Sequence, residues 1–187
     1  MRLGYAGLLN STEANIPGGL DFGMNLVEFG VRPYESGAIS LGIDLLMESF
    51  KAAKGCAFNS ISHKTAVEPM TGITIDRSRA TVLAFGAPLN FTQTIGGKLA
   101  ITIGATAKVN LNADTYMDYT NTTGDNCSYS VYGITTNRLT YDIHAAITYD
   151  DFGIYGSYSP MKVFAPGAGP DFNFFSVGVI IRTLDIE

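Results

Sequence analysis

Residues 99–112 read LAITIGATAKVNLN, an alternation of apolar side chains with polar residues or glycine. From Ile101 to Leu111 every odd position is apolar, and the even positions hold Thr, Gly, Lys and Asn. Successive side chains of a β-strand point to opposite faces, so this segment has one apolar face and one polar face. The pattern predicts a long strand that separates two very different environments.

The same alternation recurs in residues 38–48 and 139–149, with Leu46 as the exception. Its polar positions include the charged residues Asp44, Glu48 and Asp142. Several long strands that carry charges on one face and apolar side chains on the other are typical of a transmembrane β-barrel.

Composition fits this prediction. The chain has 187 residues, which we expect to form a single domain over 1–187. Only 16% of the residues are charged and the mean hydropathy is +0.16, yet no run approaches the roughly 18 apolar residues of a membrane helix. The net charge of −5 and the pI of about 4.9 argue against a nucleic-acid partner, which needs a basic face.

Eight strands can be placed along the chain, at residues 2–10, 20–33, 38–51, 79–93, 98–113, 137–149, 153–164 and 172–183. The connections between them alternate between short ones, at 33–37, 94–97 and 149–153, and long ones, at 11–19, 52–78, 114–136 and 165–171. Outer-membrane barrels have short periplasmic turns and long external loops. The sequence therefore predicts an all-β fold, an eight-stranded antiparallel up-and-down transmembrane β-barrel with short periplasmic turns and long extracellular loops.

Two positions interrupt the regular pattern. In the second strand, Met24 and Leu26 follow one register and Val27, Phe29 and Val31 the other, which predicts a β-bulge near Leu26–Val27. Pro160 lies near the end of the seventh strand and cannot donate a ladder hydrogen bond.

Energetics decide which face contacts lipid. A lipid-facing Arg or Lys at mid-depth costs roughly 2–4 kcal/mol, so the apolar face must point outward and the charged face into the lumen. An eight-stranded barrel is narrow enough for side chains to fill it. Because unpaired buried charges are costly, we expect a polar network in the lumen. Its members are Glu28, Arg32, Asp44, Glu48, Lys108, Asp142, His144 and Arg182.

The chain also resembles a known family. Its central segment, residues 82–91 followed by Gly96-Gly97 and 98–111, is similar to the central hairpin of the small outer-membrane β-barrel domains common in Bacteroidetes. The C-terminal segment 149–160, with Phe164, Gly169-Pro170 and residues 175–178 after it, resembles that family more closely. The resemblance implies an outer-membrane barrel and carries over no catalytic residue. Such barrels often end on an aromatic residue, whereas this chain ends at Glu187.

Few residues indicate a catalytic, redox or metal-binding function. Cys56 and Cys127 fall in two predicted external loops, where they form either a disulfide in an oxidising compartment or two free thiols. His63 lies in a loop and His144 on a strand two residues from Asp142, but no Gly-x-Ser-x-Gly motif is present. We expect no catalytic set, no cofactor and no metal site.

These observations favour a non-enzymatic integral outer-membrane protein with a side-chain-filled lumen. Its long loops would serve surface interaction or envelope structure, with an extracellular protein or glycan as partner. We expect a monomer in contact with outer-membrane lipid in a bacterium. No signal peptide precedes the first strand, so we expect an export leader to have been removed. Two alternatives are a soluble eight-stranded barrel that binds an apolar ligand and a membrane-embedded hydrolase that uses His63 or His144.

Overall fold

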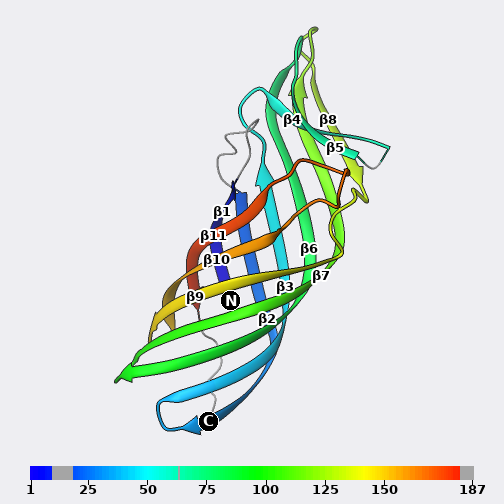
Figure 1. Cartoon of the computed structure of the whole chain (residues 1–187). Helices are drawn as coiled ribbons and strands as arrows, with labels where there is room; N and C mark the ends of the chain where they lie inside the picture. The colour runs from blue at the N-terminus through cyan, green and yellow to red at the C-terminus, as the bar shows by residue number, and fades with distance from the viewer. Residues whose placement is uncertain (10–18, 63, 182–187) are drawn as a thin grey trace.

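The computed structural model describes residues 1–9, 19–62 and 64–181, and these form an all-β, antiparallel protein (Figure 1). The strands of this described part are β1 (Arg2–Leu9), β2 (Gly19–Tyr34), β3 (Gly37–Lys51), β4 (Cys56–Ile61), β5 (Lys64–Pro69), β6 (Thr74–Gly96), β7 (Leu99–Thr120), β8 (Asn126–Tyr132), β9 (Leu139–Tyr149), β10 (Phe152–Lys162) and β11 (Asn173–Ile181). Among the described residues, no helix has the length and apolar character needed to cross a membrane.

Eight of these strands close into a ring. The order is β1, β2, β3, β6, β7, β9, β10 and β11, and every neighbouring pair is antiparallel. The ring closes where β1 pairs with β11, from Arg2 opposite Ile180 to Leu9 opposite Asn173. The eight predicted strands correspond one to one with these eight, and the predicted all-β, antiparallel fold is confirmed.

The two faces of the ring differ as the alternation predicts. On β7, Ile103 and Val109 point outward with 55% and 41% of their surface exposed, whereas Thr106 and Lys108 point inward and are buried. Leu46, the exception in its strand, is buried on the inner face. We call the outward apolar side chains of the ring the apolar belt; its large members are Leu3, Tyr5, Leu20, Met24, Leu26, Val27, Phe29, Val31, Ile39, Leu41, Ile43, Leu83, Phe85, Leu89, Phe91, Ile101, Ile103, Val109, Leu111, Leu139, Tyr141, Ile143, Ile147, Ile154, Val177 and Val179.

β-Bulges occur where the alternation of apolar and polar residues shifts by one position. On β2, Asn25 pairs with Asp44 and Val27 with Ile43, so Leu26 is the extra residue and the predicted bulge near Leu26–Val27 is confirmed. The ladder of β10 with β11 is also irregular around Pro160, between Ser159 and Lys162. A second parity change, which the sequence analysis missed, lies on β7, where Leu83 pairs with Asn112 and Ala84 with Asn110, leaving Leu111 as the extra residue.

The prediction that residues 52–78 and 114–136 form loops is wrong. β6 and β7 pair continuously from Thr74 opposite Thr120 to Gly96 opposite Leu99, well past the ring, and β8 adds to β7. β4 and β5 form a separate hairpin beside them (Figure 1). Past the bulge, alternation resumes on the opposite parity, with Ala113, Thr115 and Met117 buried, so the segment continues as strand. We call β4, β5, β8 and the paired ends 74–82 and 113–120 the projecting region.

The three predicted short connections are tight turns at the end of the ring opposite the projecting region (Figure 1). Their chemistry fits, because Gly97 has a φ of 54° and Asp150 a φ of 57°, a left-handed conformation that glycine and aspartate tolerate best. Lys98 and Asp150 form an exposed ion pair between two of these turns. We call this the turn end and the opposite one the loop end.

Candidate functional site

The centre of the ring holds a buried ion cluster. Lys108 on β7 contacts Glu48 on β3 at 2.6 Å and Asp142 on β9 at 2.8 Å, and all three side chains are almost fully buried. Inward alternation on three strands brings these residues together, although they are far apart in sequence. The ammonium also lies 5.6 Å from the centre of the Phe174 ring, a cation–π contact that adds stabilisation in a dry site.

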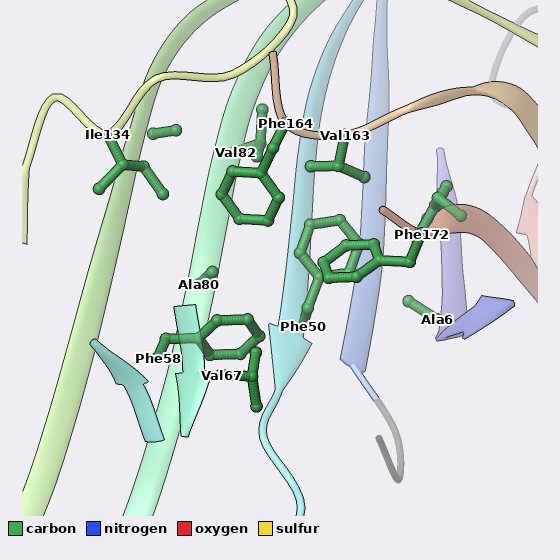
Figure 2. Close-up of a cluster of buried hydrophobic side chains, with 12 residues drawn as sticks. Ala6, Phe50, Phe58, Val67, Ala80, Val82, Ile134, Val163, Phe164 and Phe172 are labelled. Carbon is green, nitrogen blue, oxygen red and sulfur yellow. The ribbon is translucent and has the colours of Figure 1, made fainter. Parts of the chain in front are cut away.

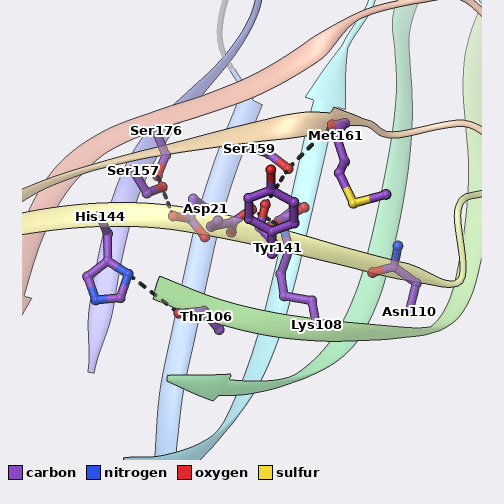
Figure 3. A network of polar contacts seen from close by, with 12 residues as sticks. Asp21, Thr106, Lys108, Asn110, Tyr141, His144, Ser157, Ser159, Met161 and Ser176 are labelled. Carbon is purple, nitrogen blue, oxygen red and sulfur yellow. Dashed lines mark hydrogen bonds and ion pairs between the residues drawn. The ribbon is translucent and has the colours of Figure 1, made fainter. Parts of the chain in front are cut away.

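A second polar cluster lies on the adjoining wall of the ring, and sequence reasoning missed it. Asp21 on β2 is fully buried and accepts hydrogen bonds from Tyr155 Oη at 2.8 Å and Ser176 Oγ at 2.6 Å. Arg2 Nη2 lies 3.4 Å from Asp21 Oδ1, and its guanidinium is 5.7 Å from the Tyr155 ring centre. The available signal was parity, since Asp21 alternates with Phe22 and Met24 on a strand whose other face is apolar. Figure 3 shows Ser157 and Ser176, from the adjacent strands β10 and β11, close to Asp21 on β2.

His144 occupies a separate polar position on β9. Its Nδ1 is 3.4 Å from Thr106 Oγ1 (Figure 3). Its Nε2 is 2.8 Å from Asn90 Oδ1. Gly104 makes room for this contact, because a Cβ there would lie 2.5 Å from Asn90 Oδ1 and 2.7 Å from His144 Nε2. The imidazole is thus held between an amide and a hydroxyl.

The remaining members of the predicted network lie toward the turn end. Asp44 accepts a hydrogen bond from Asn25 Nδ2 at 2.8 Å, and Ser40 donates one to Glu28. Of the eight predicted residues, seven can be placed, and Arg182 lies outside the described residues.

Arg32, another predicted member of the network, has an exposed side chain. β1 pairs with β2 only at residues 19–23, so the part of β2 that holds Arg32 extends beyond the start of β1 as a hairpin with β3. No residue of β1 therefore lies beside Arg32. Arg32 lies at the mouth of the cavity described below.

Aromatic side chains close the loop end of the ring. Phe50, Phe172 and Phe174 are at most 1% exposed, and Phe50 contacts both others, with ring centres 6.1 and 5.4 Å apart (Figure 2). Phe164 stacks edge-on against Phe172 at 5.5 Å. Phe58 of the β4–β5 hairpin packs onto the same hydrophobic core. This aromatic plug fills the ring between the ion cluster and the loop end.

The turn end is open instead. A cavity of about 600 Å³ is lined there by both polar and apolar groups, and the polar ones include Asn25, Glu28, Asp44, Asn90 and His144. The interior therefore has three levels, which are a vestibule at the turn end, buried ion clusters in the middle and an aromatic plug at the loop end.

The projecting region carries exposed aromatic side chains. Tyr132 on β8 is 74% exposed and Tyr129 is 48% exposed. Among the described strands β8 pairs with β7 alone, so its other edge presents unpaired backbone groups. The hairpin beside it is anchored by bonds from Phe58 N to Ser78 Oγ at 3.0 Å and from Thr65 N to the Ala168 carbonyl at 2.7 Å.

The two cysteines are free thiols in the structure, which is one of the two alternatives that the sequence left open. Cys56 begins β4 and packs against the hydrophobic core of the loop end, while Cys127 lies on β8 opposite Tyr119, with its Sγ 3.8 Å from the Asp125 carbonyl. Separate strands thus hold the two side chains. Of the candidate hydrolase residues, His63 lies outside the described part of the chain.

Within residues 1–9, 19–62 and 64–181, no group of three His, Cys, Asp or Glu side chains is arranged to hold a metal ion. No protein-family model and no curated protein sequence matches the chain.

Proposed function

We propose that this chain is a non-enzymatic integral β-barrel protein of a bacterial outer membrane, with lipid around the ring and the projecting region as an extracellular interaction surface. The observation that carries the proposal is the apolar belt. Belt residues occur on all of the ring strands, and no charged side chain points outward between its two edges among the described ring residues. A monomer in water rarely exposes an apolar patch beyond about 300–600 Å².

The height of the belt supports a membrane position. On β3 the outward apolar residues of the belt run from Ile39 to the half-buried Met47, which is roughly 27 Å along a strand that rises ~3.4 Å per residue. At a strand tilt of about 40° this corresponds to roughly 20 Å across the membrane, close to the ~25 Å apolar band of outer-membrane barrels. Tyr149 and Phe152, both about two-thirds exposed, flank the belt at the turn end, where interfacial aromatic residues are expected.

The interior supports a structural and surface role over diffusion of solutes. Ion clusters and the aromatic plug fill the ring, so the vestibule ends blindly. The role of the molecule then falls to the projecting region, whose free β8 edge and exposed Tyr129 and Tyr132 suit an extracellular protein or glycan. The resemblance to Bacteroidetes outer-membrane barrels is in keeping with this proposal.

The two alternatives gain no support from the geometry. A soluble barrel for an apolar ligand would direct its large apolar side chains inward, whereas here they face outward and the cavity is lined by a mixture of polar and apolar groups. A hydrolase built on His144 would need a nucleophile activated by it, and the imidazole contacts an asparagine amide and the Thr106 hydroxyl, the latter at a long 3.4 Å.

A solubility experiment tests the proposal directly. We expect the folded protein to require detergent or lipid and to migrate faster on a gel when it is not boiled. Val109→Arg places a cation in the belt at a cost of roughly 2–4 kcal/mol and should block membrane insertion. Thr106→Ser, on the inner face of the same strand, should insert normally. Partition into water without detergent, or equal insertion of both variants, would contradict the proposal.

A further inference from the structure

Three cations lie on the outer face of the sheet directly above the apolar belt at the loop end. Lys51 on β3 pairs with Arg79 on β6, and Arg77 lies two residues further along β6 on the same face. Directly opposed residues have Cβ atoms about 5 Å apart, and Arg77 and Arg79 are ~7 Å apart along the strand. All three side chains are exposed. We call this group the basic cluster.

The register fixes the height of the basic cluster. Met47 pairs with Leu83 at the upper edge of the belt, Ser49 with Thr81 in the next outward row, and Lys51 with Arg79 in the row above that. Each outward row adds about 7 Å along the strand. The cations therefore lie at the depth of the lipid headgroups when hydrocarbon surrounds the belt.

A neighbouring tyrosine positions the cluster. The Arg79 guanidinium lies 5.2 Å from the centre of the Tyr116 ring, which is its partner across the β6–β7 pair. Tyr116 Oη in turn donates a 2.5 Å hydrogen bond to Asp118 Oδ1. A guanidinium placed by a ring keeps its N–H donors free for a second partner, and planar donor pairs match phosphate oxygens.

Three carboxylates flank the basic cluster, those of Asp114 and Asp118 on β7 and of Asp76 on β6. Asp118 accepts its hydrogen bond from Tyr116, and Asp76 accepts one from Thr120 at 3.1 Å. Among the described contacts, Lys51, Arg77 and Arg79 form no ion pair, whereas Lys98 at the turn end is paired with Asp150. The two edges of the belt thus differ in available positive charge.

We propose that the basic cluster binds the phosphate group of an anionic lipid whose acyl chains lie along the apolar belt below it. This inference rests on the proposed membrane function and adds a ligand class to it. Juxtamembrane cations attract anionic headgroups, and the adjacent Leu83 and Phe85 column gives the acyl chains an apolar surface. The proposed ligand is therefore a lipid phosphate and not free phosphate.

Native mass spectrometry of the protein in neutral detergent micelles doped with phosphatidic acid tests the inference. The variant carries Lys51→Gln, Arg77→Gln and Arg79→Gln. A matched control removes three exposed cations elsewhere, with the substitutions Lys64→Gln, Lys98→Gln and Lys162→Gln. We expect the cluster variant to bind phosphatidic acid roughly tenfold to a hundredfold more weakly than the control. Phosphatidylcholine should bind all three proteins equally.

The outcomes distinguish the membrane proposal from the lipid-site proposal. Folding into phosphatidylcholine vesicles, followed by the gel shift, is measured first for all three proteins. Failure of the unmodified protein to fold there would overturn the membrane proposal itself. Normal folding with equal phosphatidic acid binding by both variants would overturn the lipid site alone. Displacement of the lipid by an equal concentration of inorganic phosphate would also overturn it, because the acyl chains would then contribute nothing.

Discussion

At the scale of single residues, Lys108 has the most demanding position in the protein. It is 2% exposed and is the cation that contacts both Glu48 and Asp142. Removing one partner from a buried ion cluster leaves the others desolvated and uncompensated, which costs more than the intact cluster contributes. Loss of Lys108 would therefore destabilise the protein mainly because Glu48 and Asp142 would stay buried without a cation.

Lys108→Met keeps the length of the side chain and removes its charge. We expect a loss of about 3–5 kcal/mol in the free energy of unfolding, because Glu48 and Asp142 remain buried without a cation. Urea unfolding of the protein in lipid vesicles, followed by the gel shift, measures this. Lys98→Met, in an exposed pair, is the control and should change little. Equal effects of the two substitutions would contradict the role given to the cluster.

Asp125, at the tip of the projecting region, makes a smaller and pH-dependent contribution to the stability of its turn. Hydrogen bonds from Thr123 at 2.6 Å and from Asn121 at 3.2 Å hold the pKa of this carboxyl below its ordinary value of 3.8. A lowered folded-state pKa stabilises the turn above the ordinary value, and that stabilisation is lost as the pH falls through the lowered one. The turn should therefore loosen only in strong acid.

Thr123→Val removes the principal donor, so the pKa of Asp125 should rise toward its ordinary value. Carboxyl-carbon NMR titration of the folded protein measures it. Thr122→Val keeps both donors and should leave the pKa of Asp125 unchanged. An unchanged value in the Thr123 variant would show that the hydrogen bonds do not control this carboxyl.

At the scale of elements, the bulge at Leu111 allows one strand to serve two parts of the molecule. Below it the even positions of β7 face the ring interior, and above it the odd positions, from Ala113 onward, are buried. One extra residue reverses the faces of a strand. Deleting it restores plain alternation, with Asn110 and Ala113 still inward and Asn112 outward.

Deletion of Leu111 should therefore yield a protein that still folds and shifts on the gel. Deletion of Ala105, within the regular part of the same strand, should prevent folding, because it turns either Thr106 and Lys108 or Thr102 outward. Refolding into detergent micelles distinguishes the two. If the Ala105 deletion folds as well as the Leu111 deletion, the register of β7 is not fixed by its two faces.

The eight ring strands, their faces and the bulge at Leu26 could be predicted because alternation is local information. The projecting region could not, because the sequence predicts a long connection over 114–136, whereas a single bulge at Leu111 only reverses the alternation and β7 continues to Thr120. Pairing partners are also non-local. The contacts among Lys108, Glu48 and Asp142 follow from inward parity, but the link from Asp21 to Tyr155 and Ser176 depends on which strands are neighbours across the ring closure.

At the scale of the whole molecule, the two ends of the ring are unlike. The turn end opens into the vestibule of about 600 Å³, and the loop end is closed by Phe50, Phe172 and the side chains around them. In the proposed orientation the vestibule faces the periplasm. Solutes on that side reach the vestibule as far as Arg2 and His144, and solutes outside the cell do not.

Thiol labelling in cells tests this polarity. In a chain with Cys56→Ser and Cys127→Ser, an impermeant maleimide should label Ser128→Cys on intact cells, because this position of β8 is exposed. Asn25→Cys, which lines the vestibule, should react only after the outer membrane is opened. Labelling of Asn25→Cys on intact cells would mean that the loop end is not closed or that the orientation is reversed.

The pairing of β1 with β11 joins the first and last strands of the ring, Arg2 opposite Ile180. β1 therefore has no partner on that side until β11 has been synthesised. A chain truncated by premature termination before Asn173 would leave two raw edges, and such edges recruit other chains. Closure of the ring therefore requires every strand from β1 to β11 to be present in one chain.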